Sequence, residues 1–119
     1  MRSYSMWTDV KMFMSACDQG ISEENAKLYL NLIKEEFEEL MQANVDNDDV
    51  ERLDGCMDLI WVTLGYCIAK GYNIKGAWQE VADSNLAKID SKTGKVIKNH
   101  QGKVMKPAGW VAPNLKRFV

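Results

Sequence analysis

The chain has 119 residues, 46% of them hydrophobic and 27% charged, which is enough for one globular core and too short for two domains. Residues 1–90 carry 8 basic against 17 acidic side chains, whereas residues 91–119 carry 7 basic side chains and no acidic one. This polarity fits either a basic tail folded onto an acidic body, or an acidic cluster that holds cations beside a basic segment that meets an anion.

The helical pattern begins close to the N-terminus. Apolar residues at spacings of three and four predict a first helix over about residues 6–18, which ends at Gly20. Ser22 is the expected N-cap of a second helix, which runs to about Asn44.

Two further helices follow. The stretch VDNDD at residues 45–49 is expected to be a loop that supplies the cap of a third helix over about residues 50–70. Gly71 ends this helix, and Asn73 caps a fourth helix over about residues 74–88.

The helical pattern stops after Asp90. The segments GKVIK (residues 94–98) and GKVMK (residues 102–106) nearly repeat around the residues NHQ, which predicts a short β-hairpin. The remaining residues look extended and anchored by Trp110 and Pro113, on their own subunit or on a neighbour. We therefore expect an all-α, four-helix single domain over residues 1–119, with a helical core at about 6–90 and a basic hairpin and tail at 91–119.

The predicted compartment rests on the cysteines and the apolar runs. Cys17, Cys56 and Cys67 form no CxxC motif and lie among apolar residues, so we expect buried free thiols. The segment MRSYSMW lacks the apolar region of a signal peptide, and the longest uncharged apolar run, LIWVTLGYCIA, is too short to span a bilayer. These features predict a cytoplasmic protein without a membrane partner.

Four glutamates stand close together on the second helix. At about 100° per residue, Glu36 falls in the middle of the apolar face, Glu39 at its edge and Glu35 slightly farther round. Glu38 falls on the far side beside Lys34, where it should be solvated. A lone acidic residue in such a place would reach water at the edge of the core, but three converging carboxylates favour a bound cation.

The third helix carries a matching acidic face. Glu51, Asp54 and Asp58 lie at positions i, i+3 and i+7, and Gly65 continues this face, which allows another helix to come close. Carboxylates without histidine or cysteine suit Mg²⁺, with Mn²⁺ as a substitute, rather than zinc. The only histidine, His100, lies in the predicted turn, which argues against a di-iron bundle.

Four segments together resemble a known superfamily. The residues EEFEEL (35–40) resemble the first metal motif of the all-α nucleoside triphosphate pyrophosphohydrolases, which include MazG-like proteins, phosphoribosyl-ATP pyrophosphohydrolases and dimeric dUTPases. DGCMDLIWVTLGYCIAKG (54–71) resembles the second motif, and EVADSNLAKID (80–90) and GKVMKPAGWVAPNL (102–115) resemble later segments of one branch.

The resemblance implies a metal site. The implied ligands are Glu36, Glu39 and Asp58, with Asp54 adjoining, and the implied base that activates water is Glu35. Many relatives have a glutamate where this chain has Gly55, and Asp54 stands in for it.

The resemblance also implies substrate-binding residues: Asn85, Lys88, Lys103, Lys106 and Trp110. Each has a plainer interpretation. Asn85 could satisfy the last carbonyls of its helix, the lysines of the hairpin could simply be solvated, and Trp110, like Trp7, could stack on a base or fill the core.

The implied reaction is Mg²⁺-dependent hydrolysis of a (deoxy)nucleoside triphosphate to the monophosphate and pyrophosphate. The alternatives are dUTP or phosphoribosyl-ATP as substrate, or a non-catalytic helical oligomerisation module. The third helix is apolar nearly all round beyond Asp58, and the resemblance implies a dimer or a dimer of dimers, so we expect a homo-oligomer. The acidic body and the lack of an RNA or DNA motif argue against a nucleic-acid partner.

Overall fold

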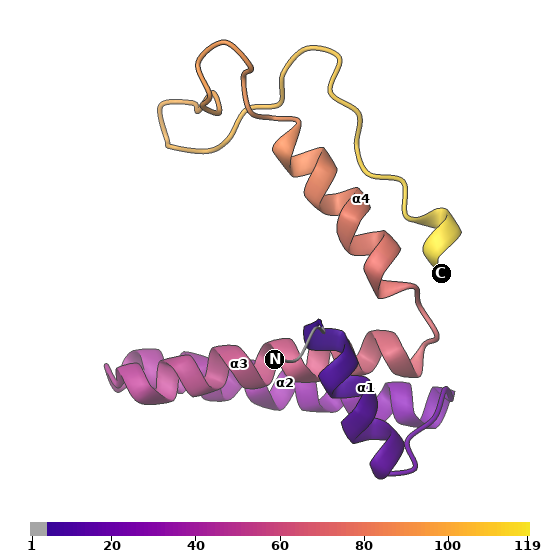
Figure 1. The fold of residues 1–119 in the computed structure, drawn as a ribbon. Helices are drawn as coiled ribbons and strands as arrows, with labels where there is room; N and C mark the ends of the chain where they lie inside the picture. The colour runs from indigo at the N-terminus through magenta and orange to yellow at the C-terminus, as the bar shows by residue number, and fades with distance from the viewer. Residues whose placement is uncertain (1–4) are drawn as a thin grey trace, which may run out of the picture. The chain divides into compact units, whose positions relative to one another are not determined.

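The computed structural model describes residues 5–119 and is all-helical, as the sequence predicts. Its elements are α1 (Met6–Ala16), α2 (Glu23–Val45), α3 (Asp49–Ala69), α4 (Ile74–Leu86) and a short 3₁₀ helix, η1 (Lys116–Phe118) (Figure 1). The described residues form two compact units that meet in sequence at Ile74 and Lys75. None of the helices within residues 5–119 is long and apolar enough to span a membrane.

The first helix ends earlier than predicted. α1 stops at Ala16, and the residue that takes up the left-handed conformation is Asp18, with φ of 57°, rather than Gly20. The short polar side chain of aspartate tolerates this conformation. The chain then turns sharply, and the Gln19 N–H donates to the Met14 carbonyl at 2.9 Å.

The caps of α2 and α3 are those that the sequence predicts. The Ser22 side chain accepts a hydrogen bond from the Asn25 N–H at 3.0 Å, and the Asp48 side chain accepts one from the Glu51 N–H at 3.1 Å. Each cap satisfies one of the backbone N–H groups that a helix leaves unpaired at its start. α2 and α3 therefore begin within one residue of their predicted positions, and Gly71, with φ of 77°, follows the end of α3.

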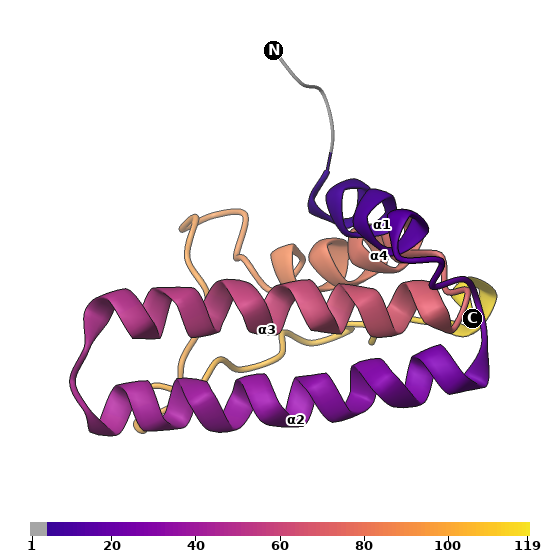
Figure 2. The same ribbon diagram turned by 90° about the horizontal axis from the view of Figure 1, so that it is seen from below.

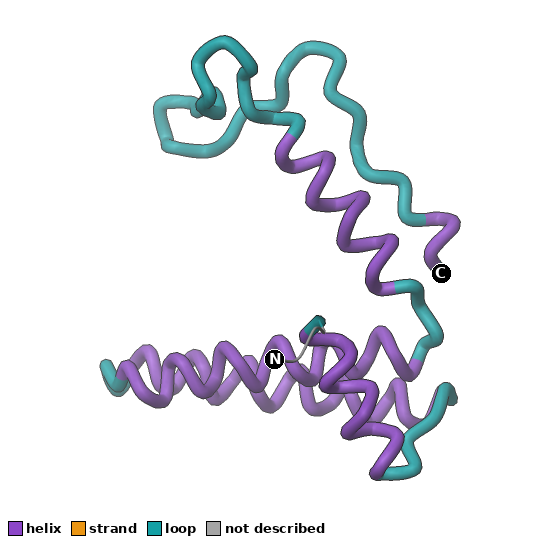
Figure 3. The backbone as a smooth tube through the Cα atoms, viewed as in Figure 1, coloured by secondary structure: helices purple, strands orange, loops and turns teal. Residues whose placement is uncertain are grey.

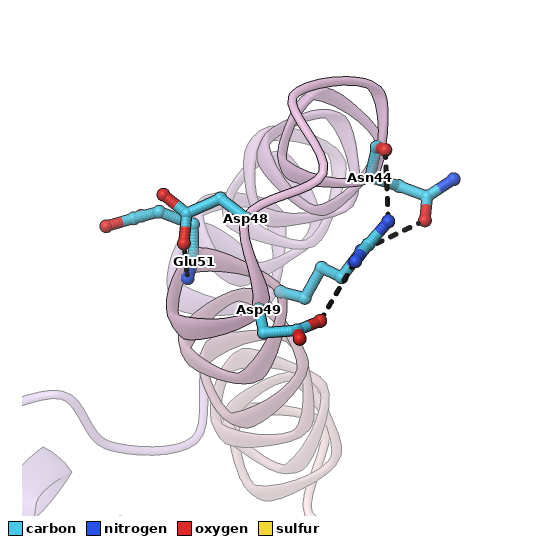
Figure 4. Close-up of polar contacts among 5 residues, drawn as sticks. Asn44, Asp48, Asp49 and Glu51 are labelled. Atoms are coloured by element: carbon cyan, nitrogen blue, oxygen red, sulfur yellow. Dashed lines mark hydrogen bonds and ion pairs between the residues drawn. The ribbon is translucent and has the colours of Figure 1, made fainter.

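The short turn between α2 and α3 makes the two long helices lie side by side (Figure 2). Arg52 fastens this end of the pair. Its guanidinium donates to the Asn44 side chain at 3.1 Å, to the Asn44 carbonyl at 3.3 Å and to Asp49 at 2.9 Å (Figure 4).

Two glycines on α3 let α2 come close. A Cβ atom at Gly65 would lie 2.3 Å from the Tyr29 ring, and one at Gly55 would lie 3.2 Å from the Cα of Leu40. The predicted close approach at Gly65 is confirmed. Around it lies the core of the first unit, formed by these buried residues: Val10, Met14, Ala26, Tyr29, Val62 and Ala69.

The predicted β-hairpin is wrong, since the structure has no strand within residues 5–119 (Figure 3). The two repeated segments do approach each other in antiparallel sense, through an isolated bridge between Lys98 and Val104. A second isolated bridge joins Val96 of the first segment with Ile89. The Asn99 side chain accepts the N–H of Gln101 at 2.9 Å and makes a tight turn. Pairing this short does not extend into strands, because a lone two-stranded ribbon is marginal in water.

The tail packs along α4 within the second unit. The Asn114 N–H and the Arg117 guanidinium each lie 3.2 Å from the Glu80 carboxylate, and the Trp110 indole N–H donates to the Ser84 carbonyl at 2.7 Å. Of the two placements that the sequence left open, the tail takes the one on its own chain. Trp110 and Pro113 are half-buried, and Trp110 is a predicted anchor that the hydrogen bond to Ser84 confirms.

The expectation of buried thiols is wrong for one cysteine. Cys17 is exposed and directly follows the end of α1. Cys56 and Cys67 are half-buried on α3. All three are free thiols.

Candidate functional site

Glu36 occupies an unusual position on α2. Its side chain is half-buried, and its Oε2 atom is shielded from solvent without a hydrogen-bond partner. Within residues 5–119 this is the one buried side-chain oxygen or nitrogen without a hydrogen-bond partner. An orphaned carboxylate oxygen is costly, so its presence indicates a partner such as a cation.

Four carboxylates influence one another across α2 and α3. Burial raises the pKa of Glu36, and the charges of Glu39, Asp58 and Asp54, together with hydrogen bonding to Glu39, raise it further. Burial also raises the pKa of Asp58, as do the charge and hydrogen bonding of Asp54 and the charge of Glu39. The four predicted ligands, two on each helix, thus lie near enough for their charges to act on one another.

The chemistry of this donor set fits a hard divalent cation. It offers carboxylate oxygens alone, one of them orphaned, which is the ligand type that Mg²⁺ and Mn²⁺ prefer. However, no three His, Cys, Asp or Glu side chains of residues 5–119 lie in an arrangement that would itself hold a metal ion. Glu39 and Asp54 are exposed, so their side chains have room to change rotamer.

The remaining glutamates lie outside this cluster. Glu35 and Glu38 are exposed on α2, and Glu51 is exposed on the first turn of α3. The solvated position predicted for Glu38 is confirmed. Glu35 adjoins Glu36 in sequence, and its role as the base stays a prediction.

Gly55 explains why Asp54 belongs to the cluster. A Cβ atom at position 55 would lie 3.2 Å from the Cα and Cβ atoms of Leu40, so a side chain there would make a tight contact with α2. Asp54 lies one residue earlier, on the exposed side, and its charge raises the pKa of both Glu36 and Asp58. That Asp54 replaces a glutamate at position 55 as a ligand stays a prediction.

The second unit gathers four of the five predicted substrate-binding residues. The Lys88 Nζ atom donates to the Asn85 side chain at 3.0 Å and lies 4.9 Å from the centroid of the Trp110 ring. The Lys106 Nζ atom lies 5.1 Å from the same centroid. Lys103 lies in the turn, where its backbone N–H donates to the Asn99 side chain at 3.0 Å. The contacts around Asn85 and Trp110 described above do not include the Lys103 side chain.

Sequence analysis did not identify two residues of α4 that hold the tail against this helix. Glu80 and Ser84 bind the tail, the first through its carboxylate and the second through its backbone carbonyl. The available signal was their spacing, because Glu80 and Ser84 lie at i and i+4, on one side of the helix. A backbone acceptor such as the Ser84 carbonyl leaves no trace in the side-chain pattern.

Comparison with known proteins identifies one family. Residues 15–85 match the model of a family described as phosphoribosyl-ATP pyrophosphohydrolase. The matched stretch is more than half of the chain and contains the four clustered carboxylates and Asn85. A search of curated proteins found no match.

Proposed function

Because the chain belongs to the phosphoribosyl-ATP pyrophosphohydrolase family, within the all-α MazG-like superfamily, it is a hydrolase of phosphoric anhydrides, and we propose that its substrate is a nucleoside triphosphate. The products are the nucleoside monophosphate and pyrophosphate. The observation that carries the proposal is the orphaned Oε2 atom of Glu36 within a cluster of four carboxylates.

The cofactor that we propose is Mg²⁺, with Mn²⁺ as a substitute, since MazG-like pyrophosphohydrolases generally depend on divalent metals. The residues that would hold it are Glu36, Glu39, Asp54 and Asp58. When bound, such an ion neutralises phosphate charge and lowers the pKa of water towards neutrality. In its absence, the four carboxylates repel one another, and this repulsion favours uptake of a cation.

Two further roles fall to side chains of this chain. Glu35 is exposed beside Glu36 in sequence, and a carboxylate there would accept a proton from the attacking water. In the second unit, the ammonium groups of Lys88 and Lys106 would bind phosphate oxygens of the substrate. Asn85, which binds Lys88, orients that ammonium group.

A second candidate substrate is phosphoribosyl-ATP, which the description of the matched family favours. This molecule also carries a triphosphate and would release pyrophosphate, so the roles proposed for the carboxylates and the lysines do not change. dUTP remains the third candidate from the same superfamily. The groups that distinguish these substrates are the base and the sugar.

Product analysis tests the reaction. The protein is incubated with MgCl₂ and with separate ribo- and deoxynucleoside triphosphates or phosphoribosyl-ATP, and the products are resolved by anion exchange. We expect monophosphate and pyrophosphate from the wild type and from Glu38→Gln, the matched control on the solvated side of α2, but not from Glu36→Gln. Release of inorganic phosphate and a diphosphate would contradict the proposed bond, and no turnover of any substrate would favour the non-catalytic helical module.

We also propose that the protein is a homo-oligomer. Apolar side chains on α3 are exposed at helical spacing: Val50 by 76%, Leu53 by 63% and Met57 by 51%. Together with Asp49 and Asp54 they line a depression of about 500 Å³. An apolar stripe of this kind favours contact with a second copy. Sedimentation equilibrium tests the proposal, and a monomer at all concentrations would overturn it.

A further inference from the structure

Trp110 is held in place by the end of α4. The last four carbonyls of a helix have no partner within the helix, and three of those in α4 are satisfied locally: Asp83 accepts from the Ala87 N–H at 2.9 Å, Asn85 from the Lys88 N–H at 3.1 Å and Leu86 from the Ile89 N–H at 3.0 Å. The Ser84 carbonyl instead accepts the indole N–H of Trp110 at 2.7 Å. This bond ties a tail residue to the helix terminus and fixes the edge of its ring.

The fixed ring brings two lysines together. Lys88 comes from the residues after α4 and Lys106 from the end of the second GKV segment, yet their Nζ atoms lie 4.9 Å and 5.1 Å from the same ring centroid. Two ammonium groups repel each other, but the π-electrons of tryptophan attract both of them. The arrangement presents two positive charges, which matches the charge of a phosphate chain.

We propose that Trp110 is a positioning residue that holds Lys88 and Lys106 for the phosphate chain of the substrate, and that it does not stack on the base. The inference rests on the proposed function, because it concerns the same substrate. Its physical reason is that the ring already interacts with two ammonium groups, and a base that stacked on a face occupied by an ammonium group would displace that group.

Binding of tripolyphosphate tests this role, because that molecule has the phosphate chain but no base. Dissociation constants for tripolyphosphate and for ATP are measured by calorimetry in EDTA, so that metal-mediated binding does not contribute. The variants are Trp110→Leu, Trp110→Phe, Lys88→Gln and Lys106→Gln. The matched control is Trp78→Leu, which removes an exposed tryptophan from α4. Far-UV circular dichroism verifies that each variant is folded.

We expect Trp110→Leu to weaken the binding of tripolyphosphate and of ATP by the same factor, roughly fivefold. This factor corresponds to the loss of an exposed cation–π interaction of about 1 kcal/mol. Trp110→Phe retains an aromatic ring and should keep most of the affinity for both molecules. It therefore tests the role of the ring if the leucine variant does not fold. Each lysine variant should weaken the binding of both molecules, and Trp78→Leu should leave both dissociation constants unchanged.

Two results would overturn the inference. If Trp110→Leu weakened the binding of ATP but not that of tripolyphosphate, the ring would stack on the base. If the wild type did not bind tripolyphosphate, or if the Trp110 variants bound both molecules as the wild type does, the ring would not position the lysines. Because these measurements involve no turnover, they stay decisive even if product analysis shows that no triphosphate is hydrolysed.

Discussion

Replacing Gly65 with alanine tests the contact that sets the spacing of α2 and α3. The added Cβ would lie 2.3 Å from Cε1 and 2.4 Å from Cδ1 of Tyr29, well inside van der Waals contact. The ring cannot easily give way, because Tyr29 is only 3% exposed and its hydroxyl donates to the Gln19 side chain at 2.7 Å. The helices must therefore move apart.

We expect Gly65→Ala to lower the free energy of unfolding by about 2–3 kcal/mol, as overpacking of a buried site does. The matched control is Gly20→Ala, because a Cβ at Gly20 meets nothing within 4 Å and its φ is not positive. Urea denaturation followed by circular dichroism measures both variants. A Gly65→Ala protein within about 0.5 kcal/mol of the wild type, the usual range for surface changes, would refute the reasoning.

A double-mutant cycle locates the effect. In a Tyr29→Ala background the ring is absent, so adding Gly65→Ala should cost much less than it does in the wild type. An unchanged cost would show that the strain arises elsewhere on α2.

Two further predictions concern the carboxylate cluster. Glu36→Gln should raise the metal-free free energy of unfolding at pH 8 by about 1 kcal/mol, because it removes a buried charge with an orphaned oxygen, and it should abolish the rise in Tm that MgCl₂ gives the wild type. Thermal melts with and without MgCl₂ check this, and an equal rise in both proteins would contradict the assignment of Glu36 as a ligand. The second prediction is a pH dependence. Since the pKa of Glu36 is raised above its ordinary value of 4.5, the folded state binds this proton more tightly than the unfolded state does. The resulting stabilisation is fully present below 4.5 and is lost as the pH rises through the folded pKa. Urea titrations in EDTA should therefore show the Glu36→Gln protein gaining stability relative to the wild type as the pH increases above 4.5, and a constant difference would contradict the raised pKa.

The parts of the fold that follow from local physics were predictable. Ser22 and Asp48 cap their helices through their own side chains, and the period of apolar residues fixes the faces of α2 and α3. The same period placed Glu36 within the apolar face, and the structure shows it half-buried there with its orphaned oxygen. Gly65 was recognised as a point of close approach for a comparable reason, because a residue without a side chain on a buried face indicates a close neighbour.

Other features depended on competition between nearly equal alternatives. Asp18 rather than Gly20 takes the left-handed turn after α1, since both residue types tolerate it and packing of the following segment decides. The two GKV segments have a strand-like pattern, but isolated bridges form where ladders were expected, because the Asn99 turn offers the backbone other hydrogen bonds. Exposure of Cys17 follows from where α1 happens to end.

Local patterns in the sequence were sufficient to predict the helices, the caps of α2 and α3 and the carboxylates on these two helices, because these features depend on contacts within a few residues. The packing of distant segments decides that the charge of Asp54 acts on both Glu36 and Asp58, that a Cβ atom at Gly55 would make a tight contact with Leu40, and that Trp110 lies near both Lys88 and Lys106. Each of these depends on how far apart two segments lie in space. That distance is set by the packing of side chains distant in sequence, which no local pattern records.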